Sequence, residues 1–385
     1  MSRNRVPSID ALRGLVMIVM ALDHVRDFFH RAAMDFLPED LSQTTTAIFL
    51  TRWITHFCAP VFMFTAGAGP YLWLFQGPNR TKPDLSRFLA SRGLWLIVLE
   101  LTVVRFAMFF SITSGVTVLE VIWALGCCMI ILALLIYLPV RVLAVFSIVV
   151  IALHNLTDPI SAGRAWDLLH RQDVFKVFGV PVVSAYPLMP WFAVMAAGYC
   201  FGEVMTFDET RRRAWMLRIG LALTAAFLVI RGIDIYGDPR PWSPGVHAVL
   251  SFLRVNKYPP SLDFLLMTLG PAILILAFFD RMRWSKRNPL IVFGRVPLFY
   301  FVGHLLLAHA LTIPAALIAY GHAGFLLVNA LPSMGGDASH FPPHFGYSLA
   351  VVYAVWILVV LLMYPACRRF ANLKARRKDW WLSYL

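Results

Sequence analysis

The stretch that decides the fold is Ala11-Leu12-Arg13-Gly14-Leu15-Val16-Met17-Ile18-Val19-Met20-Ala21-Leu22-Asp23-His24-Val25-Arg26-Asp27-Phe28-Phe29-His30. It is mostly apolar and about as long as an α-helix that crosses the hydrocarbon core of a bilayer. Its second half nevertheless carries several ionisable side chains. Each charge at membrane depth costs about 2.5–3.5 kcal/mol on insertion scales, so a helix that keeps several of them is expected to use them. The stretch predicts an integral membrane enzyme whose chemistry lies close to its first helix.

Composition extends this prediction to the whole chain. Of its 385 residues, 59% are hydrophobic and 14% are charged, whereas a soluble globular protein carries roughly 25% charged residues. Apolar stretches of membrane-spanning length recur throughout, so we expect one all-α, polytopic transmembrane bundle that forms a single domain over residues 1–385. The predicted spans are about 11–30, 49–76, 89–110, 117–138, 141–156, 185–204, 214–233, 261–280, 289–313 and 347–366.

Loop charges predict the orientation of this bundle. The net charge is +13, but the basic residues cluster in short segments between apolar runs, which favours a membrane protein over a nucleic-acid partner. Every predicted span of even number is followed by basic residues, which places both termini in the cytoplasm. These residues are Arg80, Lys82 and Arg87; Arg141; Arg211 to Arg213; Arg281, Arg283, Lys286 and Arg287; and Arg368, Arg369, Lys374 and Arg376 to Lys378.

The opposite loops are longer and mixed in charge, which suggests a surface that faces a substrate. They cover about 31–48, 157–184, 234–260 and 314–346. Within the last loop, 315–331 is apolar but short and interrupted. It could be a re-entrant or interfacial piece, or an eleventh span.

One face of the first helix carries the strongest catalytic candidates. Asp23, Arg26, Asp27 and His30 are spaced i, i+3, i+4 and i+7 and share that face, with His24 beside it. A carboxylate beside an imidazole can orient a general base and hold its tautomer. The alternative is that these residues cap the helix and point their charges outward at the membrane interface. For His30 alone, the sequence supports this capping role and a catalytic role equally.

Asp10 and Arg13 form an i, i+3 pair at the start of the same helix. They could contact a cytosolic cofactor, or they could be a surface ion pair with a helix cap. In the second span, Arg52 lies one turn before His56, and we group Arg52 with the cofactor-binding candidates and His56 with the catalytic ones. Pro60 removes the donor for the His56 carbonyl, so a kink is expected there.

Two histidines later in the chain are weaker candidates. His304 and His309 are five residues apart and share a helical face poorly, although one of them could line a cavity. Their spacing is not that of a metal site, and we expect no metal.

Several segments resemble a known family. Residues 5–15, Arg-Val-Pro-Ser-Ile-Asp-Ala-Leu-Arg-Gly-Leu, are similar to the opening of the heparan-α-glucosaminide N-acetyltransferase catalytic-domain family and its bacterial relatives. The relatives share four further segments, and the ordered set covers the whole chain. These segments are Thr55-His56-Phe57-Cys58-Ala59-Pro60, Tyr186-Pro187-Leu188-Met189-Pro190-Trp191, Lys257-Tyr258-Pro259-Pro260-Ser261 and Trp380-Trp381-Leu382-Ser383-Tyr384-Leu385.

The resemblance implies a bundle of about ten or eleven helices that moves an acetyl or other acyl group across a membrane. The donor would be cytosolic acetyl-CoA or another acyl-CoA, and the acceptor a sugar hydroxyl or amine of an envelope glycan or glycolipid. The family's eukaryotic enzyme uses a histidine just after helix one, and His30 occupies the nearest comparable position. The residues fit acyl transfer independently, with His30 or His24 as base, Asp23 or Asp27 orienting it, and Arg26 facing the oxyanion.

The resemblance and the bundle together predict a bacterial-type inner-membrane protein, which could form a homo-oligomer. A proton-coupled transporter or flippase is the alternative, because Asp23, His24 and Asp27 could equally relay protons. Against it, the sequence shows no inverted repeat.

Overall fold

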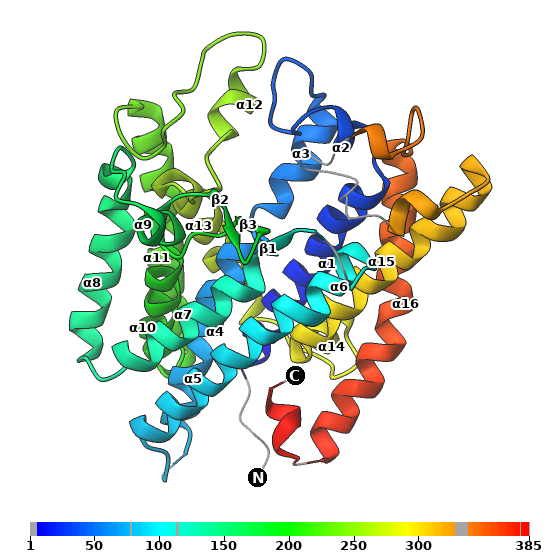
Figure 1. Cartoon of the computed structure of the whole chain (residues 1–385). Coiled ribbons are helices and arrows are strands. Elements are labelled where there is room, and N and C mark those ends of the chain that lie inside the picture. Colours follow the sequence, from blue (N-terminus) through cyan, green and yellow to red (C-terminus); the bar gives the residue numbers. More distant parts are fainter. Residues whose placement is uncertain (1–5, 78, 113–114, 328–337, 378, 385) are drawn as a thin grey trace.

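The computed structural model describes residues 6–77, 79–112, 115–327, 338–377 and 379–384. Most of these residues are helical, and the long helices form one bundle around α1 (Figure 1). The start of α1 and the end of α16 lie at the same end of the bundle, where Asp10 and Lys374 line a common cavity.

Each of the ten segments predicted to span the membrane contains a helix or a run of helices. These helices are α1 (Pro7–Phe29), α3 (Thr46–Thr55), α4 (Cys58–Phe75), α5 (Lys82–Leu99), α6 (Arg105–Phe109), α7 (Val121–Leu135), α8 (Val140–Leu153), α10 (Trp191–Val204), α11 (Glu209–Ile233), α13 (Leu262–Phe279), α14 (Pro289–Arg295), α15 (Pro297–Tyr320) and α16 (Leu349–Arg376).

Six helical segments in the described residues are long and apolar enough to cross a bilayer, and α7 and α10 are shorter apolar helices. The six are Thr46–Phe75, Val140–Thr157, Glu209–Ile233, Leu262–Phe279, Pro297–Tyr320 and Leu349–Arg376. The chain is therefore a helical membrane protein. The first helix is not among the six because it carries Asp10, Arg13, Asp23, Arg26 and Asp27.

The predicted all-α architecture is confirmed, with one small sheet as a local exception that the sequence did not predict. Its strands are β1 (Thr117–Leu119), β2 (Asp173–Val177) and β3 (Val180–Ser184), in the order β1-β3-β2. β3 pairs with β1 in parallel and with β2 in antiparallel fashion. Thr117 and Val118 favour extended backbone, so the helix predicted to begin at 117 begins at Val121. The helix predicted to begin at 185 begins at Trp191, directly after Pro187 and Pro190, because proline lacks the N–H that a helix interior needs.

Other boundaries differ because of proline and local helix geometry. The predicted span 49–76 is broken between α3 and α4 at His56 and Phe57, close to the kink expected from Pro60. The span predicted at 89–110 contains a π-helical turn, Glu100–Val104, between α5 and α6. Residues 315–320 continue α15 rather than forming a separate piece, and Gly324–Leu327 is a 3-10 turn. Residues 328–331 lie outside the described part.

Short elements complete the chain. They are α2 (Ala32–Asp35), α9 (Arg164–His170), α12 (Ala248–Leu253) and 3-10 turns at His154–Thr157, Ala338–His340 and Trp380–Ser383.

The first helix is the centre of the bundle. It packs against α3, α4, α13, α14, α15 and α16. Its contact with α14 is close enough that a Cβ on Gly14 would overlap the carbonyl oxygen of Leu290, and one on Gly294 would overlap that of Asp10. This close backbone approach, typical of small residues in membrane bundles, fixes α1 beside the cavities described next.

Candidate active site

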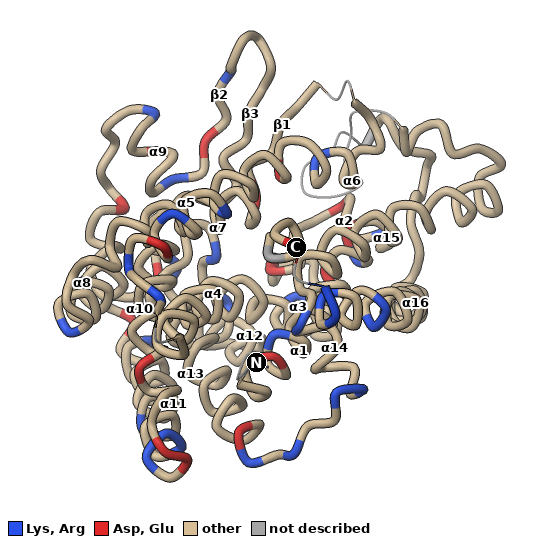
Figure 2. Tube along the Cα trace, turned by 90° about the horizontal axis from the view of Figure 1, so that it is seen from below, with Lys and Arg blue, Asp and Glu red and all other residues tan. Residues whose placement is uncertain are grey.

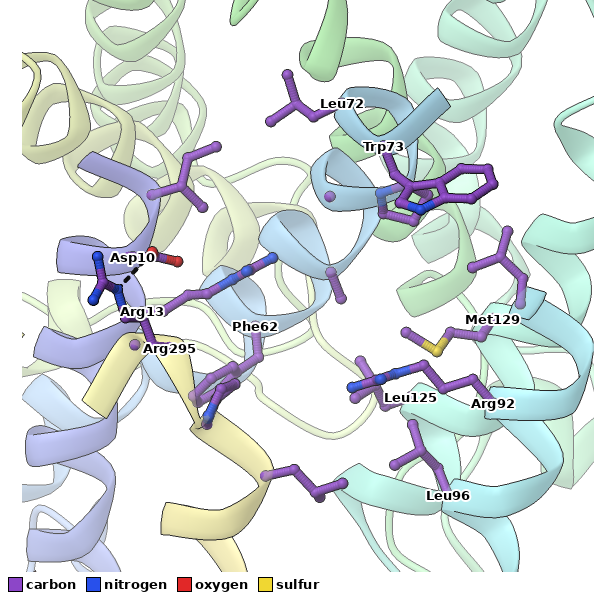
Figure 3. A pocket seen from close by; sticks show the side chains of 18 of the residues that line it. Asp10, Arg13, Phe62, Leu72, Trp73, Arg92, Leu96, Leu125, Met129 and Arg295 are labelled. Carbon is purple, nitrogen blue, oxygen red and sulfur yellow. Dashed lines mark ion pairs between the residues drawn. The ribbon is translucent and has the colours of Figure 1, made fainter. Parts of the chain in front are cut away.

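A cavity of about 360 Å³ opens beside the first half of α1 and is rich in cations. Its walls come from α1, α4, α5, α7, α14 and α15, and the end of α16 also contributes. Figure 3 shows Arg13 and Arg92 extending into this space from opposite sides. The cationic lining residues are Arg13, Arg80, Arg92, Arg295 and Lys374, and Asp10 is the one carboxylate among the described lining residues.

Individual contacts hold these cations in place. Arg295 Nε lies 3.9 Å from Asp10 Oδ2. Arg13 donates from Nε to Thr65 Oγ1 over 3.1 Å and from Nη2 to the Thr65 carbonyl. The Arg80 guanidinium lies 4.5 Å over the Trp73 ring. Guanidinium groups match phosphate oxygens in geometry and charge, so this cavity suits a polyanionic ligand with an apolar arm.

The cavity lies at the basic end of the bundle. Figure 2 views the molecule from this end and shows Lys and Arg along the loop between α13 and α14 and at the start of α11. Arg80 and Lys374, which belong to basic segments identified in the sequence, line the cavity itself.

A second cavity of about 120 Å³ lies beside the other half of α1. From α1 come Asp23, His24 and Asp27, together with the apolar residues Met20 and Phe28. The remaining polar and aromatic lining comes from four other parts of the chain and includes Arg52, Glu120, Tyr186, Lys257 and Tyr258. This cavity therefore places carboxylates, an imidazole and an ammonium group around one small volume.

Arg26 and Arg52 link the carboxylates of this region. Arg26 Nη2 donates to Asp27 Oδ1 over 2.5 Å and to Asp23 Oδ1 over 3.2 Å. Arg52 donates from Nη1 to the other Asp23 oxygen and from Nε to Glu39 Oε1 over 2.9 Å. Both arginine side chains are buried. Two buried cations thus pair with three carboxylates and fix their orientation, and buried charges are tolerated when they are paired and hydrogen-bonded in this way.

Glu39 extends the network to His56. The His56 Nε2–H donates to Glu39 Oε1 over 3.3 Å, because a carboxylate only accepts. Burial by itself would raise the pKa of the Glu39 carboxyl, but Arg52 and the hydrogen bond from His56 lower that pKa well below its ordinary value. Glu39 is therefore ionised and links the loop before α3 to the helix-one charges.

His24 is held by a second histidine across the bundle. His24 Nδ1 lies 2.8 Å from His304 Nε2, and the two ring planes are nearly parallel, at 5°. His304 Nδ1 lies 2.7 Å from the Tyr300 carbonyl, which can only accept a hydrogen bond. Neutral His304 therefore carries its proton on Nδ1 and accepts at Nε2, so His24 donates from Nδ1. The remaining ring nitrogen, His24 Nε2, is left as the atom able to take a proton.

The predicted site residues fall into three places. Asp23, His24, Asp27 and Arg52 line the smaller cavity, whereas Asp10 and Arg13 line the larger one. Arg52 was grouped with Asp10 and Arg13 as a cofactor-binding candidate, but it lines the other cavity.

Arg26, His30 and His56 line neither cavity. Arg26 is occupied by two carboxylates and does not face the smaller cavity as expected. His30 caps the end of α1 and pairs its backbone with Tyr347, and its buried Nδ1 has no hydrogen-bond partner among the described residues. The i, i+3, i+4 spacing places Arg26 beside both Asp23 and Asp27. His30, at i+7, does not continue this helical face, because α1 ends at Phe29.

Several residues of the site were missed or underrated from the sequence. Glu39 lies in a polar loop with no motif, and His304 is one of two poorly spaced histidines that were given as weaker candidates. Lys257, Tyr258 and Tyr186 belong to the quoted Lys-Tyr-Pro-Pro-Ser and Tyr-Pro-Leu-Met-Pro-Trp segments, and the Tyr258 hydroxyl donates to that of Tyr186 over 3.3 Å. The sequence signal for these three residues was that both segments are shared with the related family, and the structure brings both segments to one cavity. Among the described residues, no group of three or more His, Cys, Asp or Glu could hold a metal ion.

The fold and the paired cavities define a polytopic helical membrane protein with a buried, charged site around its first helix. A family model described as "Heparan-alpha-glucosaminide N-acetyltransferase, catalytic" matches residues 5–236. The chain belongs to this family, which indicates a membrane transferase of the acetyltransferase kind. The matched range contains α1, α3, α4 and Tyr186, whereas Lys257 and His304 lie beyond it. None of the curated protein sequences matches the chain.

Proposed function

We propose that the protein transfers an acetyl or other acyl group from cytosolic acyl-CoA to a hydroxyl or amine of an envelope glycan or glycolipid. The observation that carries the proposal is the pair of adjoining cavities along α1. One is lined by cations and the other by His24 with its carboxylates, and Met20, Phe62 and Val121 line both.

The larger cavity is the proposed donor site. Coenzyme A carries phosphates at one end and a thiol at the end of a long, flexible arm. Arg13, Arg80 and Arg92 can attract the phosphates by charge, while apolar residues such as Leu125 and Met129 line a path for the arm. Asp10 carries a negative charge that would by itself repel the phosphates. Because it forms an ion pair with Arg295, its proposed role is to orient that guanidinium.

The smaller cavity is the proposed site of transfer. His24 Nε2 takes the proton of the acceptor as its oxygen or nitrogen bonds to the thioester carbonyl carbon. The carbon–sulfur bond then breaks, and the same proton passes to the departing thiol, so the reaction needs no further reactant. His304 holds His24 in the tautomer that this role requires.

Lys257 replaces Arg26 in our assignment of the group that stabilises the oxyanion. The Lys257 ammonium lines the cavity with His24, whereas Arg26 is held by Asp23 and Asp27. A positive charge fixed beside the carbonyl oxygen favours the transition state over the ground state. Arg26 and Arg52 instead position the carboxylates around His24.

Orientation follows from the basic loops. With ten spans, the end that holds the larger cavity faces the cytoplasm and both termini lie there, in agreement with the placement of α1 and α16. The smaller cavity then faces the far side of a bacterial-type inner membrane, where the acceptor would enter.

The decisive experiment measures transfer in membranes. Vesicles containing the protein are given acetyl-CoA labelled in the acetyl group, and label is followed into the lipid and glycan fractions. We expect transfer with the wild-type protein and a loss of about 10²–10⁴-fold with His24→Gln, the range for removal of a general base. His30→Gln is measured in parallel, because His30 lies outside both cavities and is expected to retain transfer.

His247→Gln is the matched control, since His247 is exposed and lines neither cavity. Full transfer by His24→Gln, or its loss in the control, would contradict the assignment. Substrate uptake that depends on a proton gradient and not on coenzyme A would support a transporter instead.

A further inference from the structure

The two cavities meet at three apolar side chains. Met20 of α1, Phe62 of α4 and Val121 of α7 each line both spaces. Figure 3 shows Phe62 between Arg13 and Arg92 among the side chains that line the larger cavity. We call these three residues the junction.

The junction is where a thioester carbonyl must lie, and this step rests on the proposed function. The phosphate-binding cations are on one side of it, and His24 is on the other. His24 also contacts Phe301 edge-on, with ring centroids 5.9 Å apart. Because Phe301 lines the larger cavity, the base lies next to the boundary between the two spaces. The acyl chain of the donor therefore contacts the junction during transfer.

Space beyond the junction is limited and polar. The smaller cavity of about 120 Å³ must hold the end of the acyl chain together with the reacting group of the acceptor. Its walls carry Asp23, Asp27 and Glu120, so additional methylene groups would displace water from charged surfaces. Met20 of α1 is almost fully buried.

We propose that Met20, Phe62 and Val121 form a size filter that admits an acetyl group and excludes long acyl chains. In a well-packed pocket, one methylene is worth about 10- to 200-fold in discrimination. The filter determines which acyl-CoA serves as donor, while the cationic cavity binds the part that all these donors share.

The test compares the affinities of CoA, acetyl-CoA and hexanoyl-CoA for the purified protein in lipid nanodiscs. Wild-type protein is expected to bind hexanoyl-CoA at least about 10-fold more weakly than acetyl-CoA. Phe62→Ala enlarges the junction and should reduce this ratio severalfold. Phe62→Leu keeps most of the side-chain volume, so it should reduce the discrimination between hexanoyl-CoA and acetyl-CoA less than Phe62→Ala does. This second variant also keeps the size filter testable if Phe62→Ala fails to fold.

Leu125→Ala is the matched control, because Leu125 lines the larger cavity alone. Its effect should be equal for CoA, acetyl-CoA and hexanoyl-CoA, so the ratio of hexanoyl-CoA to acetyl-CoA affinity should stay at the wild-type value. Equal affinity of the wild-type protein for acetyl-CoA and hexanoyl-CoA would overturn the filter and leave the proposed function standing. Failure to bind CoA itself would overturn the proposed function and the filter together.

Discussion

His24 and His304 are joined by a 2.8 Å contact between ring nitrogens, although they lie 280 positions apart in the sequence. The chain of contacts from the Tyr300 carbonyl through His304 assigns one proton position to each ring. A site that must take up a proton at one defined atom gains from such an arrangement, because the tautomer of the base is fixed before the substrate binds.

Replacing His304 by phenylalanine should therefore impair transfer without preventing donor binding. We expect kcat to fall roughly 10- to 100-fold, less than on removal of His24 itself, with the KM for acetyl-CoA little changed. His304→Gln offers an amide oxygen to His24 Nδ1 and should recover part of the loss. The measurement is kcat as a function of pH for the three proteins, and an unchanged profile in His304→Phe would contradict the positioning role.

The Asp23–Arg52–Glu39 connection should dominate the stability of this region. Arg52→Met leaves Glu39 without its arginine partner and Asp23 with Arg26 alone, and loss of one partner of a buried pair costs about 3–5 kcal/mol. Combining Arg52→Met with Glu39→Gln removes the carboxylate that has lost its arginine and should recover part of this cost. Unfolding of the four proteins in nanodiscs gives the coupling energy as a double-mutant cycle. Strictly additive effects would show that the two side chains do not act together.

The sequence predicted the helices well because apolar length and loop charge are local properties. It located Asp23, His24 and Asp27 at a cavity for the same reason, since helical spacing fixes which side chains share a face. It could not pair His24 with His304, because nothing local tells which of several distant helices packs against α1. Glu39 was missed since a loop acid carries no periodicity. Strand β1 was missed because a short apolar run beside a helix resembles its first turn, and β3 was assigned to the outer loop 157–184.

Acid should weaken the protein through Glu39. The pKa of this carboxyl is lowered well below its ordinary value of 4.5 in the folded state, so ionised Glu39 contributes stability that is fully present above about pH 4.5. That stability is lost as the pH falls from there through the folded-state pKa. Thermal unfolding midpoints between pH 7 and pH 3 should drop less steeply in Glu39→Gln than in the wild type. Parallel curves for the two proteins would contradict the ion pairs assigned to Glu39.

Donor affinity should depend on the cations of the larger cavity. Arg80→Gln and Arg92→Gln should each raise the KM for acetyl-CoA about 10-fold, the loss expected for one charge-assisted contact, and leave kcat largely intact. Because part of the attraction is long-range, the variants should also respond less to added salt. Arg211→Gln is the control, since Arg211 is exposed at the start of α11 and lines neither cavity. An equal rise in KM for that control would indicate a general surface effect rather than binding in the cavity.

Two glycines of α4 should differ sharply in their tolerance of alanine. A Cβ at Gly67 would overlap the carbonyl oxygen of Met195 in α10, a backbone atom that cannot move aside without shifting a helix. A Cβ at Gly69 would lie 3.5 Å from the nearest neighbour, Arg13 Nη2, which is an ordinary contact. Gly67→Ala should therefore cost about 1–3 kcal/mol, as overpacking does, and Gly69→Ala should cost much less. Thermal unfolding in the same lipid compares the two directly, and equal midpoints would mean that α4 and α10 approach less closely than their backbones indicate.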